Sequence, residues 1–151
     1  MTENNIVKKS VEKHGRSRQS LLPILQDIVR QNSCLSEYNM VKVAKELDMS
    51  PAEVYGVASF YAFLDTRPLG ENIIRVCKTI VCYMHGQDKI VKAIENKLKI
   101  KLGETTPDGK FSFLPTNCIG QCHKGPAMLI NDNIYSNLTP EKAISALEEY
   151  L

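Results

Sequence analysis

Apolar residues recur at helical spacing through the first half of the chain, up to about residue 64. A period of three to four residues places them along one side of a helix, and three such helices are predicted. Ser50, Pro51 and Glu53 mark the start of the third helix, because a serine cap, a proline in the first turn and a glutamate three positions after the cap favour a helix start. The apolar positions are Leu21, Leu22, Ile24, Leu25, Ile28 and Val29, then Met40, Val41, Val43, Ala44 and Leu47, and then Val54, Val57, Ala58, Tyr61 and Leu64.

The helical part has a polar segment on one side and a break on the other. Residues 1–16 are polar and charged without a sustained period, so we expect a flexible N-terminal arm. Arg67-Pro68-Leu69-Gly70 interrupts the pattern, so a helical docking domain is predicted over residues 17–70. The Tyr and Phe residues of its third helix are of types enriched at interface cores, although they can equally fill the domain's own core.

After residue 70 the pattern changes to short β-rich runs that alternate with helical ones. This order predicts an α+β chain, in which an N-terminal helical bundle precedes an α/β domain over residues 71–151. The predicted elements of that domain are a strand at residues 73–77, a helix at 84–100, a strand at 111–118, a hairpin at 127–136 around Asp132-Asn133, and a helix at 139–147.

Composition and charge exclude some classes of protein. The chain of 151 residues is 43% hydrophobic and 24% charged, which is ordinary globular usage, and a net charge of +2 indicates neither a nucleic-acid nor a membrane partner. No apolar run approaches the roughly 20 residues of a membrane helix, and the N-terminal residues lack the apolar core of a secretory signal. We therefore expect a cytoplasmic location, where five cysteines indicate a metal or redox centre rather than disulfides.

Four of the cysteines form two close pairs, each after a predicted strand. Cys77 and Cys82 are spaced C-x4-C, and Cys118 and Cys122 are spaced C-x3-C. If the two strands lie side by side, the segments after them meet at one end of the sheet, and four thiolates converge from two sides as a two-iron cluster requires. Gly120 lies within the second pair and permits the unusual backbone angles of a tight metal-binding loop.

The spacing alone leaves several kinds of site open. A [2Fe–2S] cluster, a structural zinc ion on four cysteines, and free thiols or a disulfide all fit it. A Rieske-type cluster would use two histidines, and His85 and His123 lie near the cysteines, but four cysteines already complete a ligand set. Cys34 stands alone in the helical part, and we expect it to be a small core or surface residue.

Two other functions compete with an electron-transfer role. Residues 43–54 have the pattern of a helix-turn-helix, but no Lys or Arg lies between Pro51 and Asp65 to read DNA bases. A thiol oxidoreductase would need one activated cysteine, and the regular placement of four argues against it. The sequence contains neither G-x-G-x-x-G nor a Walker A motif, so the chain is not expected to bind NAD or a nucleotide by itself.

Taken together, these motifs resemble the thioredoxin-like [2Fe–2S] ferredoxin family, typified by the E-type subunit of the NADH dehydrogenase of respiratory complex I. The resemblance spans about residues 17–151. The matching segments are Leu21-Leu22-Pro23-Ile24-Leu25-Gln26, Val43-Ala44, Met49-Ser50, Val54-Tyr55-Gly56-Val57-Ala58-Ser59-Phe60-Tyr61, Ile74-Arg75-Val76-Cys77, Asn117-Cys118-Ile119-Gly120-Gln121-Cys122, Gly125-Pro126-Ala127-Met128 and Ile130-Asn131.

The resemblance implies a thioredoxin-like domain without the C-x-x-C motif and a [2Fe–2S] cluster on Cys77, Cys82, Cys118 and Cys122. It also implies that the chain is a non-catalytic electron-transfer subunit of an NAD(P)H-dependent oxidoreductase. The partner subunit would carry FMN, a [4Fe–4S] cluster and the NAD(P)H site, and further iron–sulfur, hydrogenase or formate dehydrogenase subunits would complete the assembly. Neither nucleic acid binding nor membrane insertion is expected.

The family occurs in several complexes, and two features favour one group of them. Gln121 and His123-Lys124 in the second loop differ from the complex I forms, and the chain is short. Both features lean toward a soluble electron-bifurcating or NAD(P)-linked hydrogenase or formate dehydrogenase. The alternative is the E-type subunit of the respiratory NADH:quinone oxidoreductase.

Overall fold

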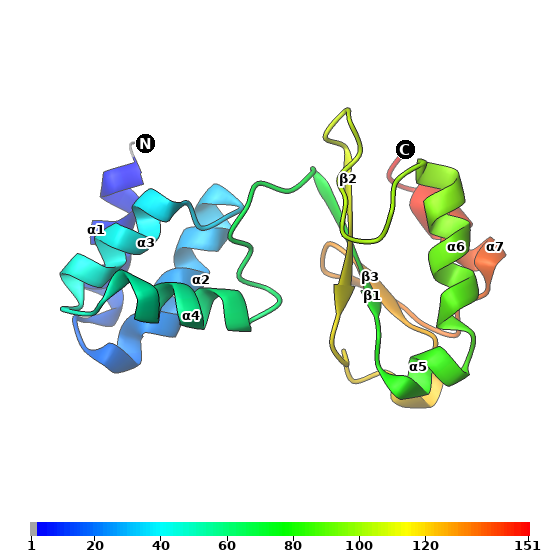
Figure 1. Cartoon of the computed structure of the whole chain (residues 1–151), viewed down its shortest axis with the longest axis horizontal. Coiled ribbons are helices and arrows are strands. Elements are labelled where there is room, and N and C mark those ends of the chain that lie inside the picture. The colour runs from blue at the N-terminus through cyan, green and yellow to red at the C-terminus, as the bar shows by residue number, and fades with distance from the viewer. Residues whose placement is uncertain (1–2) are drawn as a thin grey trace. The chain divides into compact units, whose positions relative to one another are not determined.

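The computed structural model describes residues 3–151, and Figure 1 shows the arrangement of their helices and strands. The chain divides into two compact units, Met1–Pro68 and Leu69–Leu151, each with its own hydrophobic core. The predicted order, an all-helical part followed by an α/β part, is confirmed. The division falls after Pro68, whereas the sequence placed it after residue 70.

In its described residues, 3–68, the first unit packs four α-helices around a core of aliphatic side chains. Ile24, Leu25, Ile28 and Val43 are among the fully buried members of this core. The helices are α1 (Glu3–His14), α2 (Leu21–Asn32), α3 (Glu37–Glu46) and α4 (Pro51–Phe60), and a 3-10 turn at Arg18–Ser20 precedes α2.

A flexible arm was expected over residues 1–16, of which residues 1 and 2 lie outside the described part of the chain; from residue 3 on the expectation is wrong, because α1 is part of the first unit's core. Ile6, Val7 and Val11 are buried, and the helix contacts both α2 and α3. The apolar stripe is short and its buried face includes the polar Ser10. With so few apolar positions and a polar one among them, the sequence does not show a clear helical period. The role of this segment becomes visible only in its packing against the other helices.

An ionic cluster ties the end of α1 to α2. The side chain of Asp27, only 12% exposed, accepts hydrogen bonds from Lys13 Nζ at 2.8 Å and from His14 Nε2 at 2.7 Å. These two bonds lower the pKa of the Asp27 carboxyl, since they favour its charged form. The N-terminal helix is therefore held by charge-assisted hydrogen bonds as well as by apolar packing.

Helix α4 begins where the sequence predicts and ends earlier. The Ser50 side chain accepts a hydrogen bond from the Glu53 N–H, and the Glu53 carboxylate accepts one from the Ser50 N–H, which together make the expected capping box. The helix ends at Phe60, because Tyr61 adopts an extended conformation. Leu64, predicted to lie on this helix, is buried after its end.

The second unit is a four-stranded sheet with helices against it. The strand order is β2-β1-β3-β4, with β1 parallel to β2, β3 antiparallel to β1, and β4 antiparallel to β3. The elements are β1 (Asn72–Cys77), α5 (Ile80–Met84), α6 (Gln87–Leu98), β2 (Phe111–Thr116), a 3-10 turn at Cys122–Lys124, β3 (Met128–Ile130), β4 (Asn133–Tyr135) and α7 (Pro140–Glu148).

One face of this sheet carries the second core. The register pairs Ile74 with Phe113 and with Ile130, so their side chains share a face. Helices α6 and α7 lie on the same side of the sheet in Figure 1, and they contribute Ile94 and Leu147 to the core. The apolar side chains on this face of β1 and β2 therefore pack against α6 and α7.

Two local features of the second unit differ from the prediction. The helix expected at residues 84–100 is α6, which begins later, at Gln87, and the unpredicted short helix α5 lies before it; Gly86, with a φ of 89° that does not fit a right-handed helix, lies between the two. Cys82 consequently lies on the short helix α5 instead of in a loop. In the predicted hairpin, the positive φ of 54° belongs to Asn131, and Asn133 is already part of β4.

Among the described residues, no helix is both long enough and apolar enough to span a lipid bilayer.

Candidate functional site

The sheet topology brings the two cysteine pairs to one edge. Cys77 is the last residue of β1, and Cys118 follows β2 after Thr116. Since β1 and β2 are parallel neighbours, both ends lie at the same edge. The chain then passes from β2 to β3, which flank β1 on opposite sides, so residues 117–127 must cross over the end of β1. This crossing carries Cys118 and Cys122 over the first pair.

Hydrogen bonds fasten the crossing segment to the end of β1. The N–H of Cys77 donates to the Ala127 carbonyl at 3.1 Å, and the N–H of Lys78 donates to the Thr116 carbonyl at 3.0 Å. The Ile119 N–H donates to the Cys77 sulfur. The sequence-based expectation that the two segments meet at one end of the sheet is therefore confirmed.

The first pair is buried. Cys77 and Cys82 are each 1% exposed, and the Cys77 sulfur lies 3.1 Å from the Thr79 hydroxyl. Helix α5 turns Cys82 inward. A Cβ added at Gly125 would lie 3.5 Å from its sulfur, which is ordinary van der Waals contact, so the chain after the second pair passes directly beside Cys82.

The second pair is more open to solvent. Cys118 is exposed, Cys122 is half-buried, and their sulfurs lie 3.2 Å apart. Gly120 adopts a φ of 82°, a left-handed conformation that glycine takes without strain, and its N–H donates to the Cys118 sulfur at 3.4 Å. The expected tight loop is therefore present, and the backbone N–H of Gly120 points at the Cys118 sulfur.

The electrostatics of the buried pair favour one thiolate. Burial raises the pKa of the Cys77 thiol, but hydrogen bonds from the Thr79 hydroxyl and N–H, the Cys82 thiol and the Ile119 N–H outweigh it, so the net pKa is lowered. Burial and the hydrogen bond to Cys77 raise the pKa of Cys82. One sulfur of this pair therefore deprotonates more readily, and the thiolate is the form that binds metal.

The four thiols form two pairs at one edge of the sheet, and a [2Fe–2S] cluster takes two ligands per iron. Among the described residues, no three His, Cys, Asp or Glu side chains are grouped as a site for one metal ion. Backbone donors of Ile119, Gly120 and Ala127 point at the sulfurs, as anionic sulfur requires.

The other sequence candidates lie outside this convergence. His85 and His123 are exposed to solvent. Cys34 is half-buried in the first unit between α2 and α3. The sequence pairs identified all four converging cysteines, but it did not reveal that Gly125 and Thr79 shape their surroundings.

Four thiols at a sheet edge, with backbone donors directed at sulfur, are what an iron–sulfur protein requires. The chain matches the model of the thioredoxin-like [2Fe-2S] ferredoxin family over residues 7–151, and it belongs to that family. The predicted fold class and the predicted [2Fe–2S] cofactor are thereby confirmed.

Curated relatives cover almost the whole chain. The E-type subunit of the NADH-quinone oxidoreductase of Buchnera aphidicola subsp. Acyrthosiphon pisum (strain APS) is 39% identical over 148 residues, which is 98% of this chain and 91% of the relative. The corresponding NADH-quinone oxidoreductase protein of Escherichia coli (strain K12) is 34% identical over 98% of this chain and 89% of the relative. The chain is thus similar to subunits of oxidoreductase complexes.

A solved structure shares the fold. The NAD+-reducing [NiFe]-hydrogenase in its H2-reduced state matches with a TM-score of 0.74 and 23% identity over 89% of this chain. This chain spans only 22% of that hydrogenase chain. The match at this identity is a likeness of fold, and it covers both the helical and the α/β part.

Proposed function

We propose that this chain is the electron-transfer subunit of a multi-subunit NADH-linked oxidoreductase and holds its [2Fe–2S] cluster on Cys77, Cys82, Cys118 and Cys122. The observation that carries the proposal is the convergence of these four thiols in a member of a [2Fe–2S] family. The names of the curated relatives support the association with an NADH-oxidising complex.

The chain's own residues have separate tasks in this proposal. A [2Fe–2S] cluster supplies one-electron chemistry when bound. Cys77 and Cys82 exclude water from one side of the site by their burial, while Cys118 forms its solvent-facing side. The N–H groups directed at sulfur, and the nearby Lys78 and Lys124, favour the more negative reduced state. We expect a reduction potential somewhat above the roughly −400 mV of plant-type four-cysteine clusters.

The chain acts as a carrier rather than as the site of hydride chemistry. NADH delivers a hydride, whereas a four-cysteine [2Fe–2S] site exchanges single electrons, so a flavin has to stand between them. The sequence contains no phosphate-binding loop. We therefore propose that FMN, a [4Fe–4S] cluster and the NAD(P)H site belong to a partner subunit. The cytoplasmic location stays a prediction.

Two parent complexes are candidates. The names of the relatives at 39% and 34% identity favour the E-type subunit of an NADH-quinone oxidoreductase. The residues of the second loop favour a hydrogenase or formate dehydrogenase assembly instead. The fold shared with the NAD+-reducing hydrogenase supports that alternative. Native mass spectrometry of the complex purified from its own cells distinguishes them, because the other subunits differ in mass and number.

The helical unit is proposed to dock the partner. Its hydrophobic core, as far as residues 3–68 are described, consists of aliphatic side chains, so the aromatics of α4 do not fill it. Phe60, for example, is 78% exposed. Aromatic side chains are enriched at interface cores, so their exposure favours docking over the alternative of internal packing. The exposed aromatics are Tyr38, Tyr55, Phe60, Tyr61 and Phe63.

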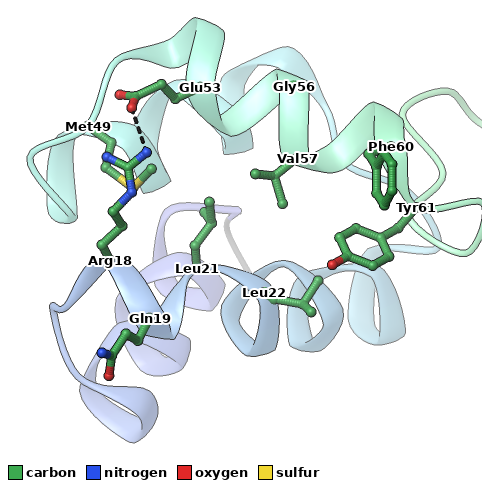
Figure 2. Close-up of a pocket in the computed structure, with 10 residues that line it drawn as sticks. All are labelled: Arg18, Gln19, Leu21, Leu22, Met49, Glu53, Gly56, Val57, Phe60 and Tyr61. Carbon is green, nitrogen blue, oxygen red and sulfur yellow. Dashed lines mark hydrogen bonds and ion pairs between the residues drawn. The ribbon is translucent and has the colours of Figure 1, made fainter.

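A groove of about 480 Å³ lies beside these aromatics, between α2 and α4 (Figure 2). An ion pair of 2.8 Å between Arg18 and Glu53 lies at one end, and Phe60 and Tyr61 lie at the other. Apolar side chains line the middle, so the groove suits an apolar segment of a partner. The lining residues are Arg18, Gln19, Leu21, Leu22, Met49, Glu53, Gly56, Val57, Phe60 and Tyr61.

The cofactor assignment is tested by metal analysis and by cysteine variants. We expect two irons and two acid-labile sulfides per chain. Serine at any of the four proposed ligand positions should damage the cluster, because each supplies one thiolate. Cys34→Ser is the matched control and should retain full iron, sulfide and visible absorbance. Stoichiometric zinc without sulfide, or bleaching by Cys34→Ser, would contradict the assignment.

Docking by the helical unit is tested with one exposed side chain. Phe60→Glu should weaken co-purification with the flavin-bearing subunit at least tenfold and leave cluster content unchanged, because the side chain is 78% exposed and packs little within its own unit. Unchanged co-purification of this variant would count against docking at this face.

A further inference from the structure

Thr79 lies immediately before α5, at the position where a threonine usually caps a helix. The hydroxyl of a capping threonine accepts a hydrogen bond from a backbone N–H in the first turn. Thr79 has the extended backbone of a cap residue, with a φ of −75° and a ψ of 157°, but its side chain makes no such bond. Its hydroxyl oxygen lies 3.1 Å from the Cys77 sulfur. The side chain therefore contacts the cysteine instead of capping the helix.

A second threonine of the same unit shows the ordinary arrangement. Thr139 also precedes a helix, α7, and its backbone is extended as well. Its hydroxyl accepts a hydrogen bond from the Lys142 N–H at 3.3 Å. Helix α5 begins without a side-chain cap, since the Tyr83 N–H donates to the Thr79 carbonyl at 3.0 Å. The two threonines thus occupy the same kind of position and differ in the partner of the hydroxyl.

A ligand sulfur fixes the direction of the bond from Thr79. Between a free thiol and a hydroxyl, either group can be the donor. A cysteine binds iron as a thiolate, which has no proton to donate. When Cys77 is a ligand, the Thr79 hydroxyl is consequently the donor and the sulfur is the acceptor. A hydrogen bond to a charged acceptor is about twice as strong as one between neutral groups.

The surroundings of Cys77 strengthen this bond. The residue is 1% exposed, so little water competes for its sulfur. The N–H groups of Thr79 and Ile119 donate to the same sulfur. Among the described residues, Thr79 carries the one side-chain hydroxyl within hydrogen-bond distance of any of the four proposed ligand sulfurs. Cys77 therefore differs from the other three cysteines in receiving a donor that a substitution can remove.

We propose that Thr79 is a positioning residue that acts through Cys77 and raises the reduction potential of the site. The inference rests on the proposed function and deepens it, because it names the side chain that sets how readily the site accepts an electron. Reduction makes the ligand sulfurs more negative, so a donor directed at the Cys77 sulfur stabilises the reduced state more than the oxidised state.

The test compares three variants of the full chain, each carrying its [2Fe–2S] cluster. Thr79→Val removes the hydroxyl and keeps the branched shape of a half-buried side chain, whereas Thr79→Ser keeps the hydroxyl. Thr139→Val is the matched control, because it removes the hydroxyl of the other cap threonine. The potential is measured by redox titration followed by electron paramagnetic resonance, and iron, sulfide and melting temperature are measured for each variant.

We expect Thr79→Val to lower the equilibrium constant for one-electron reduction about tenfold, which makes the potential about 59 mV more negative. Its iron and sulfide content should equal that of the wild type. Thr79→Ser should restore the wild-type potential, because the hydroxyl is present again. Thr139→Val should lower the melting temperature, since it loses a cap, and leave the potential unchanged.

A second measurement detects the hydrogen bond itself. Electron–nuclear double resonance of the reduced chain in H2O and in D2O identifies exchangeable protons near the ligand sulfurs. The wild type and Thr79→Ser should share an exchangeable-proton coupling that Thr79→Val lacks. Identical couplings in all three chains would contradict a hydroxyl donor at Cys77.

Three results of the titration would overturn the inference. They are a wild-type potential in Thr79→Val, an equal shift in Thr139→Val, and a shift in Thr79→Ser as large as that in Thr79→Val. If Thr79→Val does not retain the cluster, Thr79→Ala takes its place with the same expected change. If that variant also loses the cluster, Thr79 serves retention instead of the potential, and the inference is wrong. Failure of the proposed function is distinct, because the wild-type chain itself then lacks a [2Fe–2S] signal.

Discussion

Gly120 offers a sharp test of how the second cysteine loop supports the cluster. Its φ is 82°, and a Cβ added there would meet nothing within 4 Å, so Gly120→Ala changes the backbone energy without a clash. Gly109 is a matched control, because it has a φ of 71° and equally open surroundings, but it lies in the turn before β2. The two substitutions impose the same kind of strain at different places.

The magnitude follows from the left-handed conformation. Alanine costs about 1 kcal/mol more than glycine there. At Gly120 this strain acts on the conformation that directs the N–H toward the Cys118 sulfur at 3.4 Å. If the residue relaxes to negative φ, the hydrogen bond is lost, and if it does not, the loop keeps the strain. In either case the cluster-bound form loses about 1 kcal/mol, which corresponds to about fivefold faster cluster release.

The assay follows cluster loss by visible absorbance in excess chelator at 25 °C, together with urea unfolding of each variant. Gly109→Ala should lower the free energy of unfolding by about 1 kcal/mol and leave the cluster half-life unchanged. Gly120→Ala should shorten that half-life about fivefold. Equal half-lives in both variants would refute the reasoning, because they would mean that the loop conformation at Gly120 does not support the cluster.

Two further predictions concern the ionic cluster of α1 and the exposure of the thiols. Asp27→Asn should lower the free energy of unfolding by about 2 kcal/mol at pH 7, since charge-assisted bonds are lost. Bonds from Lys13 and His14 lower the pKa of Asp27 in the folded chain, so this stabilisation is present at neutral pH and is lost progressively as the pH falls from about 4 through the lowered pKa. A difference in unfolding free energy that stayed constant as the pH fell through that range in urea titrations would argue against the ion pairs. Iodoacetamide should alkylate Cys118 of the cluster-free chain well before the buried Cys77, and peptide mass spectrometry showing equal rates would contradict their difference in burial.

Several features could be derived from the sequence because they depend on neighbouring residues. The capping box at Ser50 and Glu53 needs only residues three apart, and it forms as expected. The change from helical to β-rich pattern near residue 70 places the division of the chain within two residues of Pro68. The cysteine spacings singled out the four thiols that converge, since each pair is local and follows a strand.

Other features needed the tertiary structure. Three buried apolar residues in α1 are too few to show a helical period, and their burial depends on α2 and α3, which are distant in sequence. The exposed aromatics of α4 cannot be told from core residues by composition, because the same residue types serve both purposes. Their position at the surface became clear only from the packed bundle, because its described core consists of aliphatic side chains.

The sequence alone predicted which four thiols make up the candidate site, because thiol type and spacing are local properties, but the spacing left an iron–sulfur cluster, a zinc ion and free thiols open. The structure decided how the thiols meet. The order β2-β1-β3 forces the segment after Cys118 across the end of β1, and the break at Gly86 creates a short helix that turns Cys82 inward and Met84 outward. Strand order and helix orientation arise from contacts between distant segments, and for that reason a local pattern could not reveal them.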